Sequence, residues 1–185
     1  MINRSSIGSL LVFVGVAASV SHTLAADSSI ATQLQKNRVT QERQLVSPSG
    51  QWKVSLSRSR EGGNYKLVLE NRSGVKHEID ESGKPDFRIV WSESENYLAV
   101  SKPTGFATMI SIYALAKDPA TELFSSAKTN QWPYVDYALD KWDTEAKRAV
   151  IKVYENPRYL EPKRAPRLLA LIYVYLDGKT DYGGH

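Results

Sequence analysis

The chain has no cysteine among its 185 residues and only three histidines. The lack of cysteine excludes a disulfide framework, a thiolate nucleophile, a cysteine-based zinc site and a thioether-linked lipid anchor. Past the N-terminal apolar segment the only histidines are His77, in a predicted strand, and His185, the last residue. A catalytic triad needs a histidine that contacts a nucleophile, and the sequence has no GxSxG elbow to supply a serine. We therefore expect neither nucleophilic catalysis nor a cofactor.

A large excess of one charge is also lacking. The sequence carries 24 Lys and Arg against 20 Asp and Glu, a formal net charge of +4. The basic residues are scattered rather than arranged in a stripe, so the sequence shows no nucleic-acid footprint. We expect no nucleic-acid partner.

No apolar run reaches the roughly 20 residues that a membrane-spanning helix needs. The longest N-terminal run, Ile7–Val20, has 14 residues, follows Arg4 and precedes the small-residue site Thr23-Leu24-Ala25. This pattern predicts a secretory signal peptide over residues 1–25, with an uncleaved anchor as the alternative. The expected product is periplasmic or secreted, without stable membrane insertion, and the absence of cysteine favours a bacterial periplasm.

The remaining 160 residues fit one domain on length. We interpret residues 26–44 as a polar leader or short helix, 45–180 as a single all-β domain and 181–185 as a flexible tail. Period-2 alternation and turn residues predict the strands, namely Trp52–Ser57, Tyr65–Leu69, Val75–Ile79, Phe87–Trp91, Asn96–Ser101, Ala107–Tyr113, Thr121–Phe124, Arg148–Tyr154 and Leu168–Leu176. The last of these is apolar on both faces, which predicts a central strand covered on both sides.

The chain repeats one segment. Val46–Ser57 (VSPSGQWKVSLS) returns as Trp91–Lys102 (WSESENYLAVSK) at an offset of 45 residues. In both copies a serine-rich turn leads into an aromatic residue, Trp52 or Tyr97, and then a strand. Trp142-Asp143-Thr144-Glu145 resembles the start of the second copy and indicates a third unit. A period of about 45 residues with a strand meander in each unit is typical of propeller blades.

These units resemble the WD40-like repeats of TolB-type and peptidase-associated β-propellers. Their W-S-P-D-G-K-x-L-A-like turn and strand are matched by Val46–Val54 and Trp91–Val100, and Leu176-Asp177-Gly178-Lys179 echoes a later part of the motif. The chain departs from the motif at its aspartate, which is serine in both copies (Ser49 and Ser94), and at its glycine, where Glu95 stands in the second copy.

The resemblance implies an all-β fold of antiparallel meanders in propeller-like blades. Closed propellers generally have about four or more blades, so a β-sandwich built of meanders is the alternative. An open array leaves unpaired strand edges, which predicts a homodimer through a sheet edge.

Two stretches are candidate binding sites. The first is Asn130–Asp143, where aromatic faces beside carboxylates suit a sugar ring, and where a carboxylate pair could serve glycoside hydrolysis. Its candidate residues are Trp132, Tyr134, Asp136, Tyr137, Asp140, Trp142 and Asp143. The alternative is that these aromatics are strand core and the aspartates are turn residues.

The second stretch is the proline-stiffened loop Glu155–Arg167. Arginine and tyrosine dominate protein-binding hot spots, and this loop exposes several such residues. Its candidate residues are Arg158, Tyr159, Lys163 and Arg164. An anionic ligand, a lipid headgroup or a purely solvated loop are the alternatives.

Together these features predict an exported, non-catalytic binding module whose partner is a protein or a cell-envelope glycan. The alternatives are a carbohydrate-active hydrolase that uses the aspartates, and an inhibitor or immunity-type protein that acts through the loop.

Overall fold

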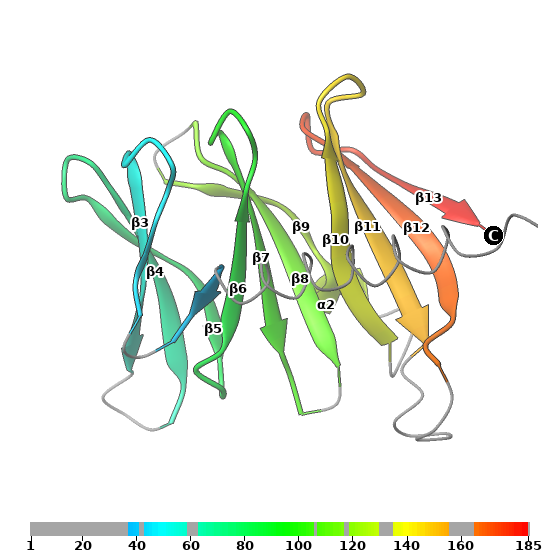
Figure 1. Cartoon of the computed structure of the whole chain (residues 1–185), viewed down its shortest axis with the longest axis horizontal. Coiled ribbons are helices and arrows are strands. Elements are labelled where there is room, and N and C mark those ends of the chain that lie inside the picture. The colour runs from blue at the N-terminus through cyan, green and yellow to red at the C-terminus, as the bar shows by residue number, and fades with distance from the viewer. Residues whose placement is uncertain are drawn as a thin grey trace, which may run out of the picture. The chain divides into compact units, whose positions relative to one another are not determined.

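A computed structural model describes residues 37–40, 43–58, 63–105, 107–116, 119–129, 135–155 and 165–184 (Figure 1). The predicted signal peptide and most of the predicted leader lie outside these residues. Within them, no helix is both long and apolar enough to cross a membrane.

The described strands form three antiparallel sheets, so the all-β prediction is confirmed. The first sheet is a meander of β2 (Leu45–Val46), β3 (Trp52–Arg58), β4 (Tyr65–Asn71) and β5 (Lys76–Ser82). The second contains β6 (Phe87–Trp91), β7 (Tyr97–Pro103), β8 (Thr108–Ala114) and β9 (Thr121–Ser125), with β1 (Arg38–Val39) added beside β6. The third contains β10 (Val135–Asp143), β11 (Arg148–Glu155), β12 (Leu168–Tyr175) and β13 (Thr180–Gly184).

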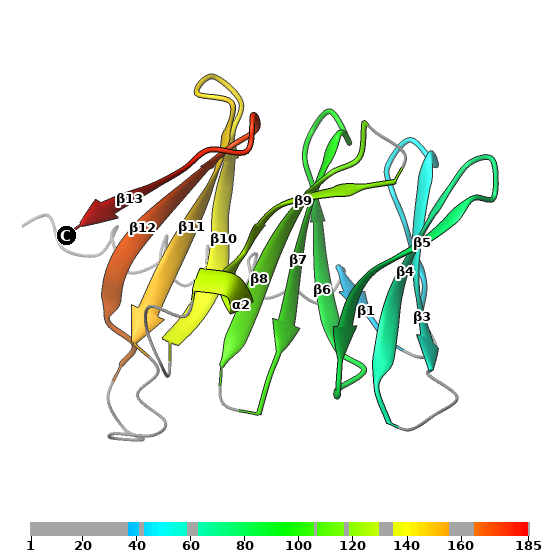
Figure 2. The same ribbon diagram turned by 180° about the vertical axis from the view of Figure 1, so that it is seen from behind.

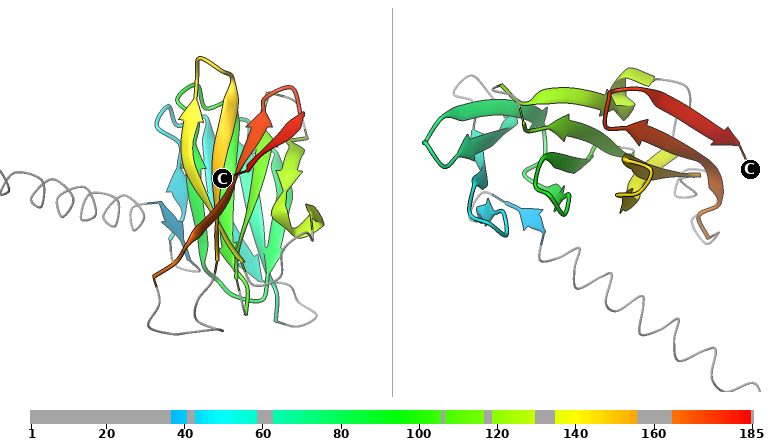
Figure 3. Two further views of the ribbon diagram at one scale, coloured as in Figure 1. Left: turned by 90° about the vertical axis from the view of Figure 1, so that its right-hand side faces the viewer. Right: turned by 90° about the horizontal axis from the view of Figure 1, so that it is seen from above.

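The first and third sheets are thus four-stranded meanders, and the second is a four-stranded meander with β1 added at its edge. A short helix, α2 (Ser126–Thr129), follows β9 at the end of the second sheet (Figure 2). The described strands close no ring, because the first and third sheets lie on opposite sides of the second (Figure 3).

The second sheet is buried on both faces. Its strand β7 has three consecutive buried residues, and these point alternately to opposite faces. Leu98 and Val100 pack in the cluster shared with the first sheet, whereas Ala99 packs in the cluster shared with the third. Two hydrophobic cores therefore join three sheets, and each core has the second sheet as one wall.

The 45-residue repeat corresponds to a repeated hairpin turn. In the first copy, Ser47 N donates to Trp52 O (2.9 Å) and Trp52 N donates to Ser47 Oγ (3.2 Å). In the second, Ser92 N donates to Tyr97 O (3.0 Å) and Tyr97 N donates to Ser92 Oγ (3.1 Å). Each serine side chain thus caps its own turn, which is the physical reason for a serine at both positions.

The domain boundaries were wrong at both ends. Val39, in the predicted leader, is fully buried and pairs with Phe87 of the second sheet. At the other end, most of the predicted flexible tail belongs to β13, where Tyr182 pairs with Ile172. Neither segment is long or apolar enough to show a hydrophobic period. Each forms a strand by pairing with the strand beside it.

The prediction for Leu168–Leu176 was half right. Its strand β12 does lie inside its sheet, between β11 and β13. Only one of its faces is fully buried, however, through Ala170, Ile172 and Val174. The residues between them are half-buried. In the second sheet a core lies on both faces of β7 and β8, whereas its edge strand β9 begins with two exposed residues.

The outward faces of both end sheets carry ion pairs between neighbouring strands. On the first sheet these include Lys53–Glu70 (2.8 Å) and Lys66–Glu78 (2.7 Å), and on the third sheet Lys152–Asp140 (2.6 Å). Such pairs suit a solvated terminal face. The third sheet also carries Tyr173, whose ring stacks under the Arg148 guanidinium at 4.3 Å.

Candidate binding site between the second and third sheets

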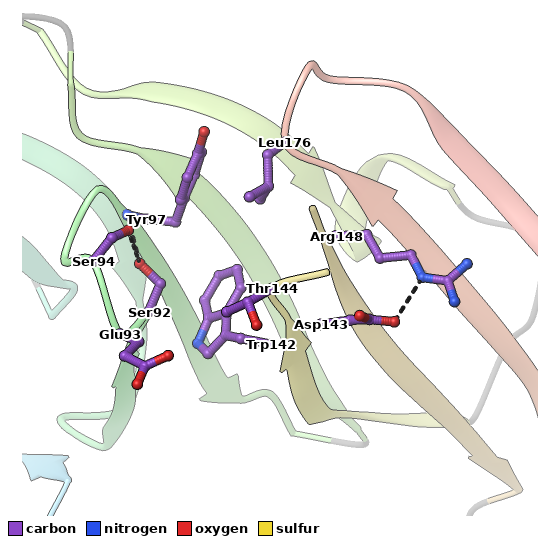
Figure 4. A pocket seen from close by; sticks show the side chains of 9 residues that line it. All are labelled: Ser92, Glu93, Ser94, Tyr97, Trp142, Asp143, Thr144, Arg148 and Leu176. Carbon is purple, nitrogen blue, oxygen red and sulfur yellow. Dashed lines mark hydrogen bonds and ion pairs between the residues drawn. The ribbon is translucent and has the colours of Figure 1, made fainter. Parts of the chain in front are cut away.

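A pocket of about 380 Å³ lies where the second and third sheets meet at their hairpin turns (Figure 4). Both walls come from the repeated turn, one from its second copy and one from its third. The lining residues are Ser92, Glu93, Ser94, Tyr97, Trp142, Asp143, Thr144, Arg148 and Leu176.

The apolar part of the pocket is formed by Tyr97 and Trp142. Tyr97 begins β7, and Trp142 lies near the end of β10, where a bulge after Leu139 restores its side chain to the face of the shared core. The ring centroids are 6.3 Å apart and the rings are tilted by 37°. Trp142 Nε1 is buried and has no hydrogen-bond partner among the described residues.

The polar rim is formed by two serines of the second turn. Ser92 Oγ and Ser94 Oγ lie 3.4 Å apart, and either hydroxyl can donate to the other. No histidine lines the described pocket, so neither serine has a general base beside it there. The rim presents two hydroxyl groups that can hydrogen-bond a ligand.

Asp143 and Arg148 form the outer edge of the pocket. Arg148 Nε donates to Asp143 Oδ2 at 3.2 Å, and the pair points away from the serines (Figure 4). The backbone N–H of Ala146, and then Arg148, hold the pKa of Asp143 below its ordinary value. Asp143 occupies the place in its turn that Ser47 and Ser92 occupy in theirs, but its Oδ1 accepts from Ala146 N, three residues on, whereas each serine hydroxyl accepts from the backbone N–H five residues on.

The remaining described residues of Asn130–Asp143 make structural contacts. Tyr137 is only 3% exposed and packs in the core, so its ring is not available to a sugar. Asp136 Oδ1 accepts a hydrogen bond from Thr108 N (2.6 Å), which ties β10 to β8. Asp140 forms an ion pair with Lys152 (2.6 Å) on the neighbouring strand. Of the predicted candidate residues that the structure describes, Trp142 and Asp143 line the pocket.

The other predicted binding residues lie outside the described part of the chain. They are Trp132, Tyr134, Arg158, Tyr159, Lys163 and Arg164. The two ends of the Glu155–Arg167 loop are described, and Glu155 N donates to Arg167 O at 2.8 Å. Across the described residues, no cluster of three or more His, Asp or Glu side chains has the arrangement of a metal site.

Sequence reasoning missed Ser92, Ser94, Tyr97 and Glu93 as site residues. The repeated segment Trp91–Lys102 was used to predict the fold and not a binding site. The signal that could have identified it was Glu95, which breaks the motif in the second copy. Comparison with known proteins adds no assignment, since the chain matches no protein-family model and no curated protein is significantly similar to it in sequence.

Proposed function

We propose that the chain is an exported, non-catalytic binding module that takes its partner in the pocket between the second and third sheets. The observation that carries this proposal is the combination of an apolar floor, Tyr97 and Trp142, with a rim of hydroxyl groups. Binding sites are typically concave and apolar, with a few polar groups that fix orientation.

The absence of catalysis is part of the proposal. Asp136, Asp140 and Asp143 would be the carboxylates of a glycoside hydrolase, and each already has a protein partner. A general acid or base must be able to reach the substrate and exchange a proton with it. These contacts support a structural role for the three aspartates.

Export is supported by residues 1–25, which have the pattern of a signal peptide, and by the absence of cysteine. The resemblance to propeller repeats adds little on function, because such repeats serve scaffolds and enzyme lids alike. The periplasm, or the medium, is where we propose that the partner is met.

The proposed partner is a protein rather than a glycan. A flat sugar-binding platform needs coplanar exposed rings, whereas Tyr97 and Trp142 are tilted by 37° and Tyr137 is in the core. A tilted aromatic pair with hydroxyl groups beside it suits a side chain inserted from a protein loop. The Glu155–Arg167 loop is a second surface for such a partner in the alternative of an inhibitor or immunity-type protein.

Site-specific photocrosslinking in the producing cell tests this proposal. A photoreactive amino acid at Thr144, exposed at the pocket, should give one discrete adduct. The matched control carries the same group at Ser57, exposed on the first sheet. The adduct should disappear in Tyr97→Ala. No adduct at Thr144, or one that Tyr97→Ala leaves unchanged, would contradict the proposal.

A further inference from the structure

The first and second hairpin turns share their backbone hydrogen bonds and the position of their left-handed residue. Gly50 N donates to Ser47 O (2.9 Å), and Glu95 N donates to Ser92 O (2.9 Å). The residues that donate, Gly50 and Glu95, both have a left-handed backbone, with φ of 73° and 54°. The turns also share the serine caps described above, so they are two copies of one local structure.

The match extends to the second serine of each turn. Gln51 N donates to Ser49 Oγ (3.3 Å), and Asn96 N donates to Ser94 Oγ (3.4 Å). Both serine hydroxyls accept a bond from their own turn in this way. The Ser49 hydroxyl hydrogen is thereby left to donate outward, and the Ser94 hydroxyl hydrogen can donate either outward or to Ser92 Oγ, 3.4 Å away.

In the first turn, that outward donation goes to a carboxylate. Ser49 N donates to Glu95 Oε1 (2.7 Å) and Ser49 Oγ donates to Glu95 Oε2 (2.5 Å). Hydrogen bonds from the Ser47 and Ser49 hydroxyls hold the pKa of Glu95 below its ordinary value. The first turn is therefore a carboxylate-binding site, and its ligand is a glutamate from the next hairpin along the chain.

The second turn has the same donors but no carboxylate. Its neighbour is the third hairpin, where the left-handed residue is Lys147 and Ala146 stands two residues before β11, as Glu95 stands two residues before β7. Neither side chain has a carboxylate to offer the serine. Ser94 N has no hydrogen-bond partner among the described residues, and Ser94 borders the pocket. The pocket thus lies on the side of the second turn that Glu95 occupies on the first.

We infer that the Ser92–Ser94 turn binds a carboxylate, and that this carboxylate is a glutamate or aspartate side chain from a loop of the partner protein. The carboxylate accepts from Ser94 N and Ser94 Oγ, and its aliphatic stem packs on Tyr97 and Trp142. The inference rests on the proposed function and names the chemistry of the ligand. The protein source is chosen because Glu95, the occupant of the matching turn, is itself a hairpin side chain.

The charges at the site are compatible with an anion. Glu95 is bound in the first turn by uncharged donors, so no cation is needed. Of the two carboxylates in the pocket, Asp143 is paired with Arg148. Glu93 is the remaining one, and it is exposed, where the first turn has Pro48. Glu93 therefore weakens the binding of a carboxylate by a screened repulsion, and its removal should strengthen that binding.

The test is an NMR titration of amide signals of the purified chain. The probe is N-acetyl-glutamate methylamide, and its matched control is the glutamine analogue, which has the same shape without the charge. We expect a saturable shift of the Ser94 amide with the glutamate probe, at an affinity about tenfold above that of the glutamine probe. An equal response to both probes would overturn the inference.

Three variants complete the test. Ser94→Ala should lower the affinity for the glutamate probe about tenfold, because it removes a hydrogen bond to a charged group. Ser57→Ala, the control, should leave its affinity unchanged. Glu93→Gln should tighten it roughly twofold, as expected for a unit charge removed at about 8 Å in water. Since Glu93 is exposed, this last variant stays informative even if Ser94→Ala disturbs the turn. An unchanged affinity for the glutamate probe in Ser94→Ala would overturn the inference, and so would an unchanged affinity in Glu93→Gln.

Acidic sugars are the other source of a carboxylate in an envelope. N-acetylmuramic acid and N-acetylglucosamine form a matched pair of probes for this source. If N-acetylmuramic acid binds more tightly than the glutamate probe, the protein source is overturned. The photocrosslinking outcome is separate. An adduct at Thr144 that persists in Ser94→Ala would support the proposed binding module and would contradict the binding of a carboxylate by Ser94.

Discussion

Tyr113 of the second sheet donates a hydrogen bond from its hydroxyl to the carbonyl oxygen of Ile79 in the first, at 2.6 Å. Tyr113 is only 3% exposed, and burial raises its pKa, so it stays protonated and remains a donor. This bond joins a residue inside one core to a backbone group of the sheet opposite.

Tyr113→Phe should therefore lower the free energy of unfolding by about 1–2 kcal/mol, because it leaves a buried carbonyl without its donor. Urea denaturation followed by circular dichroism measures this change. Tyr182→Phe is the matched control, since Tyr182 is 43% exposed, and it should have no effect. Equal stability of Tyr113→Phe and the parent chain would show that the bond contributes nothing.

A second link between these sheets is the ion pair of Lys102 and Asp80, whose side chains are 19% and 8% exposed. Lys102→Met should cost roughly 3–5 kcal/mol of unfolding free energy, because it leaves a mostly buried carboxylate without its cation. The double variant Lys102→Met with Asp80→Leu should recover most of that loss, since it removes both charges. Urea denaturation of the three chains is the measurement, and a double variant no more stable than Lys102→Met alone would refute this account.

Glu95 should make stability depend on pH in the acidic range. Its pKa is lowered from 4.5 by the hydroxyls of Ser47 and Ser49, so the carboxylate form is the one that the fold favours. A group with a lowered pKa stabilises the fold above its unfolded pKa, and this contribution is lost as pH falls through the folded value. We expect Glu95→Gln to be less stable than the parent at pH 7, and the gap to close as the pH falls below about 4.

Thermal unfolding at a series of pH values measures that gap. The double variant Ser49→Ala with Glu95→Gln should lose little more than either single variant, since the two residues share one interaction. A gap between parent and Glu95→Gln that stays constant down to pH 3 would exclude Glu95 as the titrating group.

Gly183 lies directly against the ring of Tyr173. A Cβ at this position would be 3.0 Å from Tyr173 Cε2. The same ring is restrained by the Arg148 guanidinium, which lies 4.3 Å from its centroid. Gly183→Ala should cost about 1–3 kcal/mol, as expected for overpacking. Gly105→Ala is the control, because a Cβ there meets no atom within 4 Å. Urea denaturation compares the two, and the removal of the ring in the Tyr173→Leu background should relieve the cost.

The strands were predictable because their residues alternate locally. The predicted Phe87–Trp91 and the observed β6 have the same bounds, and the predicted Arg148–Tyr154 falls one residue short of β11. The repeat was predictable for a related reason, since a turn capped by its own serine needs only local sequence. The two-residue β1 and the polar β13 were not, because β1 pairs with a strand that is remote along the chain, and β13, although it follows β12 in a hairpin, has no alternation of apolar residues.

The site was not predictable in the same way. Whether Tyr137 faces the core and Trp142 the pocket depends on the bulge between Leu139 and Lys141, which shifts the register of β10. Asp136 and Asp140 bind groups on other strands. The spacing of the aspartates in the sequence therefore does not reveal that their carboxylates already have partners. Membership of the propeller-repeat family and dimerisation through a sheet edge stay predictions.

The pairing of β1 with β6 has a topological consequence. The chain begins its described course on the second sheet, leaves to build the whole of the first sheet, and returns to the second beside its starting point. The first sheet is therefore a loop tethered at both ends, whereas the third is joined to the second by a single connection. Detachment of the third sheet breaks the bond from Thr108 N to Asp136 Oδ1 and opens one core, whereas detachment of the first sheet opens the other core and also strains β1. The two ends of an array built from one repeat are thus unequal in cooperativity, because the described chain holds the first sheet from both sides and the third from one.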